Sequence, residues 1–270
     1  MTAGTARLEA YVRGIGLLGP GLPDWPLGAA VLRGEQPHTS TPVQLPAPAA
    51  LPSAERRRTG ATVRLALAAG LQALHGAGLE GAGLATVFTS SGGDGALCDE
   101  LCSALATPER QISPTRFHNS VHNAASGYWS IALGATTPST ALAAYDGSFA
   151  AGLLEALSQL AATGRPVLLV AYETDYPEPL RTVRPIAAPF ATALLLDPEP
   201  GTRAAAHLRA SLTEQPVDTL PQPSLEALRA GVPAARALPL LERIARRDGG
   251  RVVLEYLHDL RLAVSITPCP

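Results

Sequence analysis

The stretch PSTALAAYDGSFAAGLLEAL, residues 138–157, decides the fold of this chain. Its apolar part at 140–145 predicts a buried strand, the tripeptide Asp-Gly-Ser at 146–148 predicts a sharp turn, and 149–162 predicts a helix. A side chain at such a turn lies at a helix N-terminus, where free N–H groups and the helix dipole favour negative charge. Many enzymes place a nucleophile there, but Asp and Ser are also common helix caps, so the segment alone allows both interpretations.

Apolar runs of strand length alternate with helical patterns on both sides of this segment. Strands are predicted at Leu8–Ile15, Leu84–Thr89, Pro166–Tyr172, Phe190–Leu196 and Ala204–Leu212, and a terminal hairpin at Arg251–Glu255 and Arg261–Ile266. Helices are predicted from an N-cap at Ser53 through Val63–Leu74, from Asp94 or Gly95 through Leu105, at Ala124–Leu133, and at Leu225–Arg247 with interruptions at Pro233 and Pro239; most of Gly14–Pro52 is predicted as loop. The alternation is typical of an α/β protein with a buried sheet.

The composition excludes several classes of function. The chain has 270 residues, of which 46% are hydrophobic and 16% charged, so it can bury a sizeable core. The formal net charge of −2 gives no electrostatic reason to expect a nucleic-acid partner. All basic residues are Arg, which excludes a lysine Schiff base or a P-loop lysine. Three cysteines form no disulfide framework, and no signal peptide or membrane span is evident, so we expect a cytoplasmic protein.

Four sequence blocks carry a family resemblance. They are LPSAERRRTGATVRLAL (51–67), VFTSSGGDG (87–95), ISPTRFHNSVHNAASGYWSIA (112–132) and SFAAGLLEAL (148–157). In these blocks the chain resembles the N-terminal half of β-ketoacyl synthases, and more specifically the short ketosynthase-like or chain-length-factor proteins of aryl-polyene-type pathways. The resemblance implies a layered α/β, thiolase-like half-fold with a mixed five-stranded-type sheet and a small C-terminal helix and hairpin appendage. It places a ketosynthase N-terminal-like domain at 1–200 and an extension packed on the same domain at 201–270.

The chain departs from the family at the nucleophile. The family motif has the shape Pro-Ser-x-x-x-x-x-Ala-Cys-Ser-x-Ser, and from Pro138 its Cys falls on Asp146, with Tyr145 before it and Gly147 and Ser148 after it. Decarboxylating condensation also needs two further polar groups, which in the family come from a C-terminal half that we expect this chain to lack. The resemblance therefore implies no catalytic residue and no cofactor. Asp146 would occupy the position of a lost nucleophile.

The implied role is that of a non-condensing, chain-length-factor-like subunit. Its partner would be a full-length β-ketoacyl synthase in a heterodimer, with acyl carrier protein bound through the complex, in a type II polyketide or fatty-acid-like pathway. Residues expected at the interface or the end of the acyl tunnel are Phe117, His118, His122, Asn123, Tyr128, Trp129, Tyr145 and Phe149. Residues expected to contact an acidic carrier protein are Arg56, Arg57 and Arg58.

Other readings remain open at this point. A self-standing acyltransferase or ketosynthase-like enzyme could use another nucleophile, for example Ser148 with His122 and Asp175, although no Gly-x-Ser-x-Gly elbow is present. The pair His118 and His122 has helical metal-ligand spacing but no third ligand nearby, so we expect no metal. The loop at 90–95 fits a tight turn better than a phosphate cradle. Two cysteines at 98 and 102 share one helix face and are expected to be buried.

Overall fold

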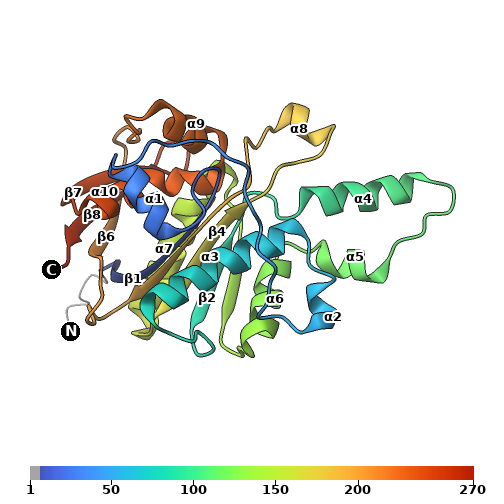
Figure 1. Ribbon diagram of the computed structural model, residues 1–270, viewed down its shortest axis with the longest axis horizontal. Coiled ribbons are helices and arrows are strands. Elements are labelled where there is room, and N and C mark those ends of the chain that lie inside the picture. The colour runs from blue at the N-terminus through green and yellow to red at the C-terminus, as the bar shows by residue number, and fades with distance from the viewer. Residues whose placement is uncertain (1–6) are drawn as a thin grey trace.

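The computed structural model describes residues 7–270, so Met1–Ala6 of the N-terminal segment lie outside the described residues. One mixed sheet forms the centre of the described chain, and helices pack on it (Figure 1). The strands are β1 (Glu9–Leu18), β2 (Ala85–Thr89), β3 (Ser139–Leu142), β4 (Val167–Glu173), β5 (Phe190–Asp197), β6 (Ala206–Thr213), β7 (Gly250–Glu255) and β8 (Arg261–Pro268). The helices are α1 (Trp25–Leu32), α2 (Ser53–Arg56), α3 (Ala61–Ala77), α4 (Gly95–Ala106), α5 (Pro114–Asn119), α6 (Ala124–Leu133), η1 (Tyr145–Gly147), α7 (Ser148–Thr163), α8 (Leu180–Val183), α9 (Pro223–Gly231), η2 (Pro233–Ala237) and α10 (Leu238–Arg246).

The sheet has the strand order β3-β2-β4-β5-β1-β6-β8-β7. Strands β3, β2 and β4 are parallel, and every other neighbouring pair is antiparallel. The five strands from β3 to β1 form the mixed five-stranded part that the resemblance implied. Strand β1 joins this part to the rest, because Glu9–Val12 pairs with β6 while Tyr11–Leu18 pairs with β5.

Helices cover both faces of the five-stranded part and divide the core in two. Helices α3 and α6 pack on one face, and α7 with the C-terminal helices packs on the other. Every residue of β4 is buried, as expected for a parallel strand covered on both faces. Helix α3 lies directly on the backbone of β1, since a Cβ atom at Gly16 would lie 1.9 Å from the carbonyl oxygen of Ala69.

The C-terminal region continues the same sheet with three strands. One row of β6, β8 and β7 is apolar and faces α10 and the core: Leu208, Ala210, Leu262, Val264, Ile266, Val252 and Leu254. The opposite row includes exposed polar side chains: Arg209, Ser211, Ser265, Thr267 and Arg251. The predicted helix and hairpin are therefore present, and they are built into the sheet rather than loosely attached to it.

Most predicted elements are confirmed, with four local corrections. Asp24 caps α1 within a segment predicted as loop, because its side chain accepts a hydrogen bond from Leu27 N at 2.8 Å. Ser53 is not an N-cap: it begins the short α2, and the apolar run belongs to a separate helix. Pro114 begins α5, a short helix that is not among the predicted elements, since proline is well suited to the first turn of a helix. Strand β3 is a half-buried edge strand, not a buried one.

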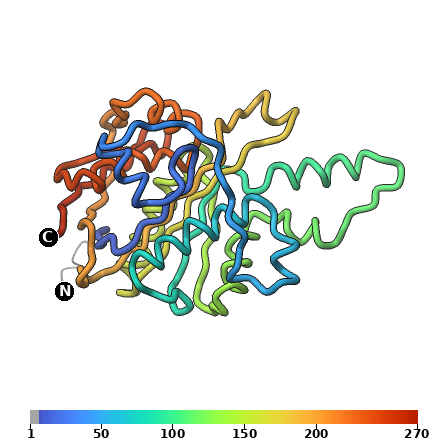
Figure 2. The backbone as a smooth tube through the Cα atoms, in the orientation of Figure 1, coloured from blue at the N-terminus to red at the C-terminus, as the bar shows by residue number. Residues whose placement is uncertain are grey.

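Helices α4 and α5 form an arm that extends away from the body (Figures 1 and 2). The prediction that Cys98 and Cys102 are buried is wrong, since both are exposed on α4. The reason is the position of the helix, which buries little besides Leu101 because it leaves the sheet. Among the described residues, no helix has both the length and the hydropathy needed to cross a membrane.

Candidate functional site

The turn between β3 and α7 is fixed by its own backbone and one hydroxyl group. Tyr145 has φ 51°, in the left-handed region that non-glycine residues rarely adopt. The Oγ of Ser148 accepts a hydrogen bond from Ala144 N at 3.0 Å and donates one to the carbonyl oxygen of Tyr145 at 2.7 Å. This hydroxyl is buried and holds the turn together, which leaves it poorly placed to act as a nucleophile.

The hairpin between β7 and β8 closes on this turn. A Cβ atom at Gly147 would lie 2.0 Å from the carbonyl oxygen of Tyr256, so only glycine fits at this position. A cavity of about 530 Å³ lies beside the turn, within the range of roughly 300–1,000 Å³ that is common for small-molecule sites. Its lining includes Tyr145, Asp146 and Leu257. The turn is therefore in contact with the C-terminal region and still open to solvent on one side.

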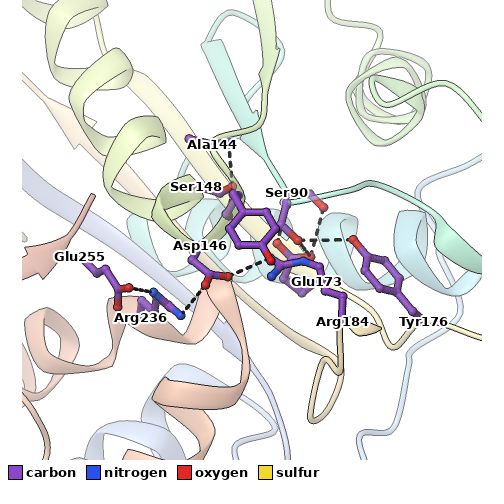
Figure 3. A network of polar contacts seen from close by, with 11 residues as sticks. Ser90, Ala144, Asp146, Ser148, Glu173, Tyr176, Arg184, Arg236 and Glu255 are labelled. Carbon is purple, nitrogen blue, oxygen red and sulfur yellow. Dashed lines mark hydrogen bonds and ion pairs between the residues drawn. The ribbon is translucent and has the colours of Figure 1, made fainter. Parts of the chain in front are cut away.

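The side chain of Asp146 lies between two arginines (Figure 3). Its Oδ1 is 2.8 Å from Nη2 of Arg184, which follows α8, and its Oδ2 is 3.1 Å from Nη2 of Arg236 on η2. The side chain of Asp146 is 33% exposed, whereas those of Arg184 and Arg236 are 18% and 10% exposed. Burial alone would lower the pKa of Arg184, but the hydrogen bond and charge of Asp146 outweigh it and raise that pKa.

The ion pairs continue into the C-terminal region. Arg236 also pairs with Glu255 at the end of β7, and Glu255 lies 3.9 Å from Arg229 on α9. Arg229 in turn forms a close pair with Glu226, 2.6 Å away. The network neutralises Asp146 with positive charge on both oxygens. A carboxylate held in this way is a weak nucleophile, so the geometry does not support acyl transfer through Asp146.

A buried carboxyl group near the turn, that of Glu173, was not predicted from the sequence. It ends β4 and accepts hydrogen bonds from the backbone N of Ser91 at 2.5 Å and from its Oγ at 2.9 Å, with the Oγ of Ser90 farther off at 3.4 Å. Burial raises the pKa of Glu173 to about 7, against the lowering effect of the Ser91 hydrogen bonds. The only sequence signal was a single Glu at the end of an apolar strand, which carries no indication of its burial.

The same carboxyl group explains the glycine-rich loop at 90–95. The backbone N–H of Ser91 donates to Glu173, and that of Gly93 donates to the Oγ of Ser90. Asp94 caps α4 by accepting from Leu97 N at 3.0 Å. Because Glu173 of β4 and the side chains of Ser90 and Asp94 use these donors, the loop is a tight turn at the start of the arm.

The predicted interface residues divide by burial. Tyr128, Trp129 and Phe149 are buried within this subunit, and Trp129 packs against Phe88 with ring centroids 5.9 Å apart. Phe117, His118 and Asn123 are exposed on or next to α5 and α6. The exposed residues can contact a partner directly. The three buried residues can influence a partner only by shaping the surface that packs over them.

The alternative catalytic sets are not assembled. The Nε2 of His122 is 3.0 Å from the carbonyl oxygen of Ser90, and Asp175 pairs with Arg181 at 3.0 Å, so neither is bonded to Ser148. Within residues 7–270, no three His, Cys, Asp or Glu side chains are grouped closely enough to hold a metal ion. His118 and His122 therefore stand without a third ligand in the described part of the chain.

The three predicted carrier-protein residues are exposed at and just after α2. Arg58 pairs with Glu55 at 3.1 Å, and Arg56 donates to the carbonyl oxygen of Leu51 at 3.1 Å. Arg57 is also exposed. Their positions leave the guanidinium groups at the surface, and their role in binding stays a prediction.

Residues 32–245 match the family described as beta-ketoacyl synthase, N-terminal domain. No curated protein matches the chain. It is similar to a solved structure of the ketosynthase ApeO in complex with its chain length factor ApeC from Xenorhabdus doucetiae, with 25% identity, a TM-score of 0.72, and coverage of 95% of this chain and 98% of that chain. It is also similar in fold to the ishigamide ketosynthase/chain length factor, with 13% identity, a TM-score of 0.73, and coverage of 97% and 99%.

A third similar structure is a beta-ketoacyl synthase from Burkholderia phymatum STM815, with 13% identity, a TM-score of 0.71, and coverage of 98% of this chain and 100% of that chain. The likenesses at 13% identity speak for the fold alone. The family match spans most of the chain and runs beyond residue 200 into α10. The fold is thus the thiolase-like fold of ketosynthase N-terminal domains, and the chain belongs to the β-ketoacyl synthase N-terminal domain family.

Proposed function

We propose that this chain is a non-condensing, chain-length-factor-like subunit that pairs with a full-length β-ketoacyl synthase. The observation that carries the proposal is the state of the nucleophile turn, where Asp146 stands in place of the family's Cys and is clamped between Arg184 and Arg236. An acyl-aspartate would be a mixed anhydride, too labile to hold a growing chain. The subunit would contribute walls to the partner's acyl tunnel in a type II polyketide or fatty-acid-like pathway of the aryl-polyene type.

The surface around β3 supports pairing with another chain. Strand β3 is at the edge of the sheet, and an edge strand offers unpaired backbone groups to a second strand. Helix α6 contacts β3, and the side chains of Phe117, Val121 and Ile131 on α5, just before α6 and on α6 are 62%, 49% and 46% exposed and line a cavity of about 460 Å³. We call β3 with these three side chains the edge surface. Exposed apolar groups gathered in this way are typical of protein–protein contacts.

The similarity to a ketosynthase solved with its chain length factor supports the choice of partner. The same comparison includes an acyl-carrier protein in complex with its ketosynthase, at 12% identity and a TM-score of 0.74. Binding of carrier protein by this chain, through Arg56, Arg57 and Arg58 and within the complex, rests on charge complementarity alone. The division into a domain at 1–200 and an extension at 201–270 likewise stays a prediction.

Co-expression tests the partner role. The chain would be expressed with the full-length ketosynthase encoded nearest to it, isolated through a tag on one partner, and its mass measured by light scattering. A stable 1:1 or 2:2 complex is expected. A stable homodimer that does not bind the ketosynthase would refute the proposal.

Substitutions at the edge surface make the test specific. Phe117→Asp is expected to abolish the complex while leaving the melting temperature of the isolated chain unchanged, because that side chain is mostly exposed. Leu212→Asp is a matched control, since Leu212 is 52% exposed on β6, on the far side of the sheet from β3. If both variants bind the ketosynthase like the wild type, the partner surface lies elsewhere.

A self-standing acyltransferase is the second candidate, and the cavity beside the turn is the observation in its favour. It predicts that the isolated chain becomes covalently acylated by an acyl-carrier or acyl-CoA donor, which intact-mass spectrometry detects. The partner role predicts no added mass. The buried, doubly bonded hydroxyl of Ser148 favours the second outcome.

A further inference from the structure

The setting of Asp146 has the features of a carboxylate-binding site. Arginine binds carboxylates strongly because its N–H groups form charge-assisted hydrogen bonds. Here two guanidinium groups approach one carboxylate, one on each oxygen, at 2.8 Å and 3.1 Å. They come from separate segments, the connection after α8 and helix η2, and both side chains are largely buried.

Both arginines have contacts of their own that hold them in place. The guanidinium of Arg184 lies 3.5 Å from the ring centre of Tyr145, in a cation–π contact. Arg236 pairs with Glu255 through its Nη1. Its Nε is buried and has no hydrogen-bond partner among the described residues. The two arginines are therefore held in position by Tyr145 and Glu255 as well as by Asp146. The Nε–H group of Arg236 remains available as a hydrogen-bond donor.

The carboxylate is also reachable from solvent. Asp146 is one-third exposed and forms part of the lining of the 530 Å³ cavity beside the turn. The rest of the lining is mixed, with Tyr256 and Leu257 beside the charged side chains of Glu255 and Arg261. Arg184 and Arg236 are not themselves lining residues, so an anion of carboxylate size would reach them only at the position that the Asp146 carboxylate now occupies.

We propose that Arg184 and Arg236 form a binding site for a small carboxylate anion, which the chain fills with its own Asp146. The aspartate acts as an internal ligand and keeps external carboxylates out. Its local concentration is far above that of any free anion, because the turn holds it beside the arginines. This inference goes beyond the proposed function and does not depend on the partner.

The test removes the internal ligand and offers formate in its place. Asp146→Ala deletes the carboxylate, which leaves Arg184 without its carboxylate partner and Arg236 with Glu255 alone, so the melting temperature is expected to fall. Sodium formate should restore that temperature in a saturable manner, compared with sodium chloride at equal ionic strength. The wild type should respond to formate and chloride alike, since its site is filled.

Two further variants show whether the arginines are responsible. In Asp146→Ala with Arg236→Gln, the apparent affinity for formate should drop about tenfold or more, the usual effect of losing a charged hydrogen bond. Glu255→Gln disturbs the same network but keeps Asp146 in place, so it should show no specific response to formate.

The inference is overturned if Asp146→Ala responds to formate no more than to chloride. Should this variant be insoluble, its refolding yield from urea replaces the melting temperature as the readout. A higher yield in formate than in chloride supports the site, and equal yields refute it. None of these results depends on whether the chain binds a ketosynthase.

Discussion

Replacing the buried Glu173 with glutamine should remove a large part of the pH dependence of stability near neutral pH. In the folded chain, burial raises the pKa of this carboxyl group from an ordinary value of 4.5 to about 7. In the unfolded chain the carboxyl ionises near its ordinary value. Between pH 4.5 and 7 the folded chain therefore binds more protons than the unfolded one, so the free energy of unfolding falls as the pH rises.

The size of the effect follows from the pKa of the folded chain. At about 1.4 kcal/mol for each pH unit, a rise from 4.5 to about 7 corresponds to roughly 3 kcal/mol of stability lost between these two pH values. The loss is complete and the curve is flat only from about one pH unit above the folded pKa. Glu173→Gln keeps a neutral polar group of the same shape beside Ser91, and it has no proton to lose.

Urea denaturation of both proteins from pH 5 to pH 8 measures this contribution. The difference in unfolding free energy between wild type and variant should shift by roughly 2.5 kcal/mol over the range, in favour of the variant at high pH. Glu226→Gln is the control and should show no such shift, because the hydrogen bond from Arg229 lowers the pKa of Glu226 and its contribution is lost only as the pH falls below this range. Parallel curves for wild type and Glu173→Gln would refute the reasoning.

Two further predictions concern the turn and the arm. Gly147→Ala should destabilise the chain by about 2 kcal/mol or more in thermal or urea denaturation, because its Cβ would overlap the carbonyl of Tyr256; Gly127→Ala on the open face of α6 is the control and should be neutral. Cys98 and Cys102 should both react quickly with a thiol reagent in the isolated folded chain, and slow, unfolding-limited reaction of either would place α4 against the body.

The strand–turn–helix pattern was predictable because it depends on local chemistry. The apolar run of β4 and the Asp94 cap of α4 each have a signal within a few residues. The short helix α1 was missed because Gly and Pro residues around it indicate loop, whereas its Asp24 cap and its burial against the core decide otherwise. Tertiary packing outweighs local preference there.

Only one residue of the site could be predicted, because the other members are brought to it by tertiary packing. Asp146 could be located from the motif, but its partners could not, because Arg184 and Arg236 lie far from it in sequence and carry no motif of their own. The exposure of Cys98 could not be predicted from the sequence either. Two cysteines at helical spacing predict burial on average, and only the departure of α4 from the sheet reverses this.

The network at the turn makes the C-terminal region part of the site. Arg236 and Glu255 both belong to residues 201–270, and both belong to the network that carries Asp146. The hairpin carbonyl of Tyr256 also packs on Gly147. Without this region Asp146 would keep only Arg184, and the face of α7 that packs on η2 would be exposed. The C-terminal region therefore supplies both an ion-pair partner for Asp146 and a backbone contact to Gly147.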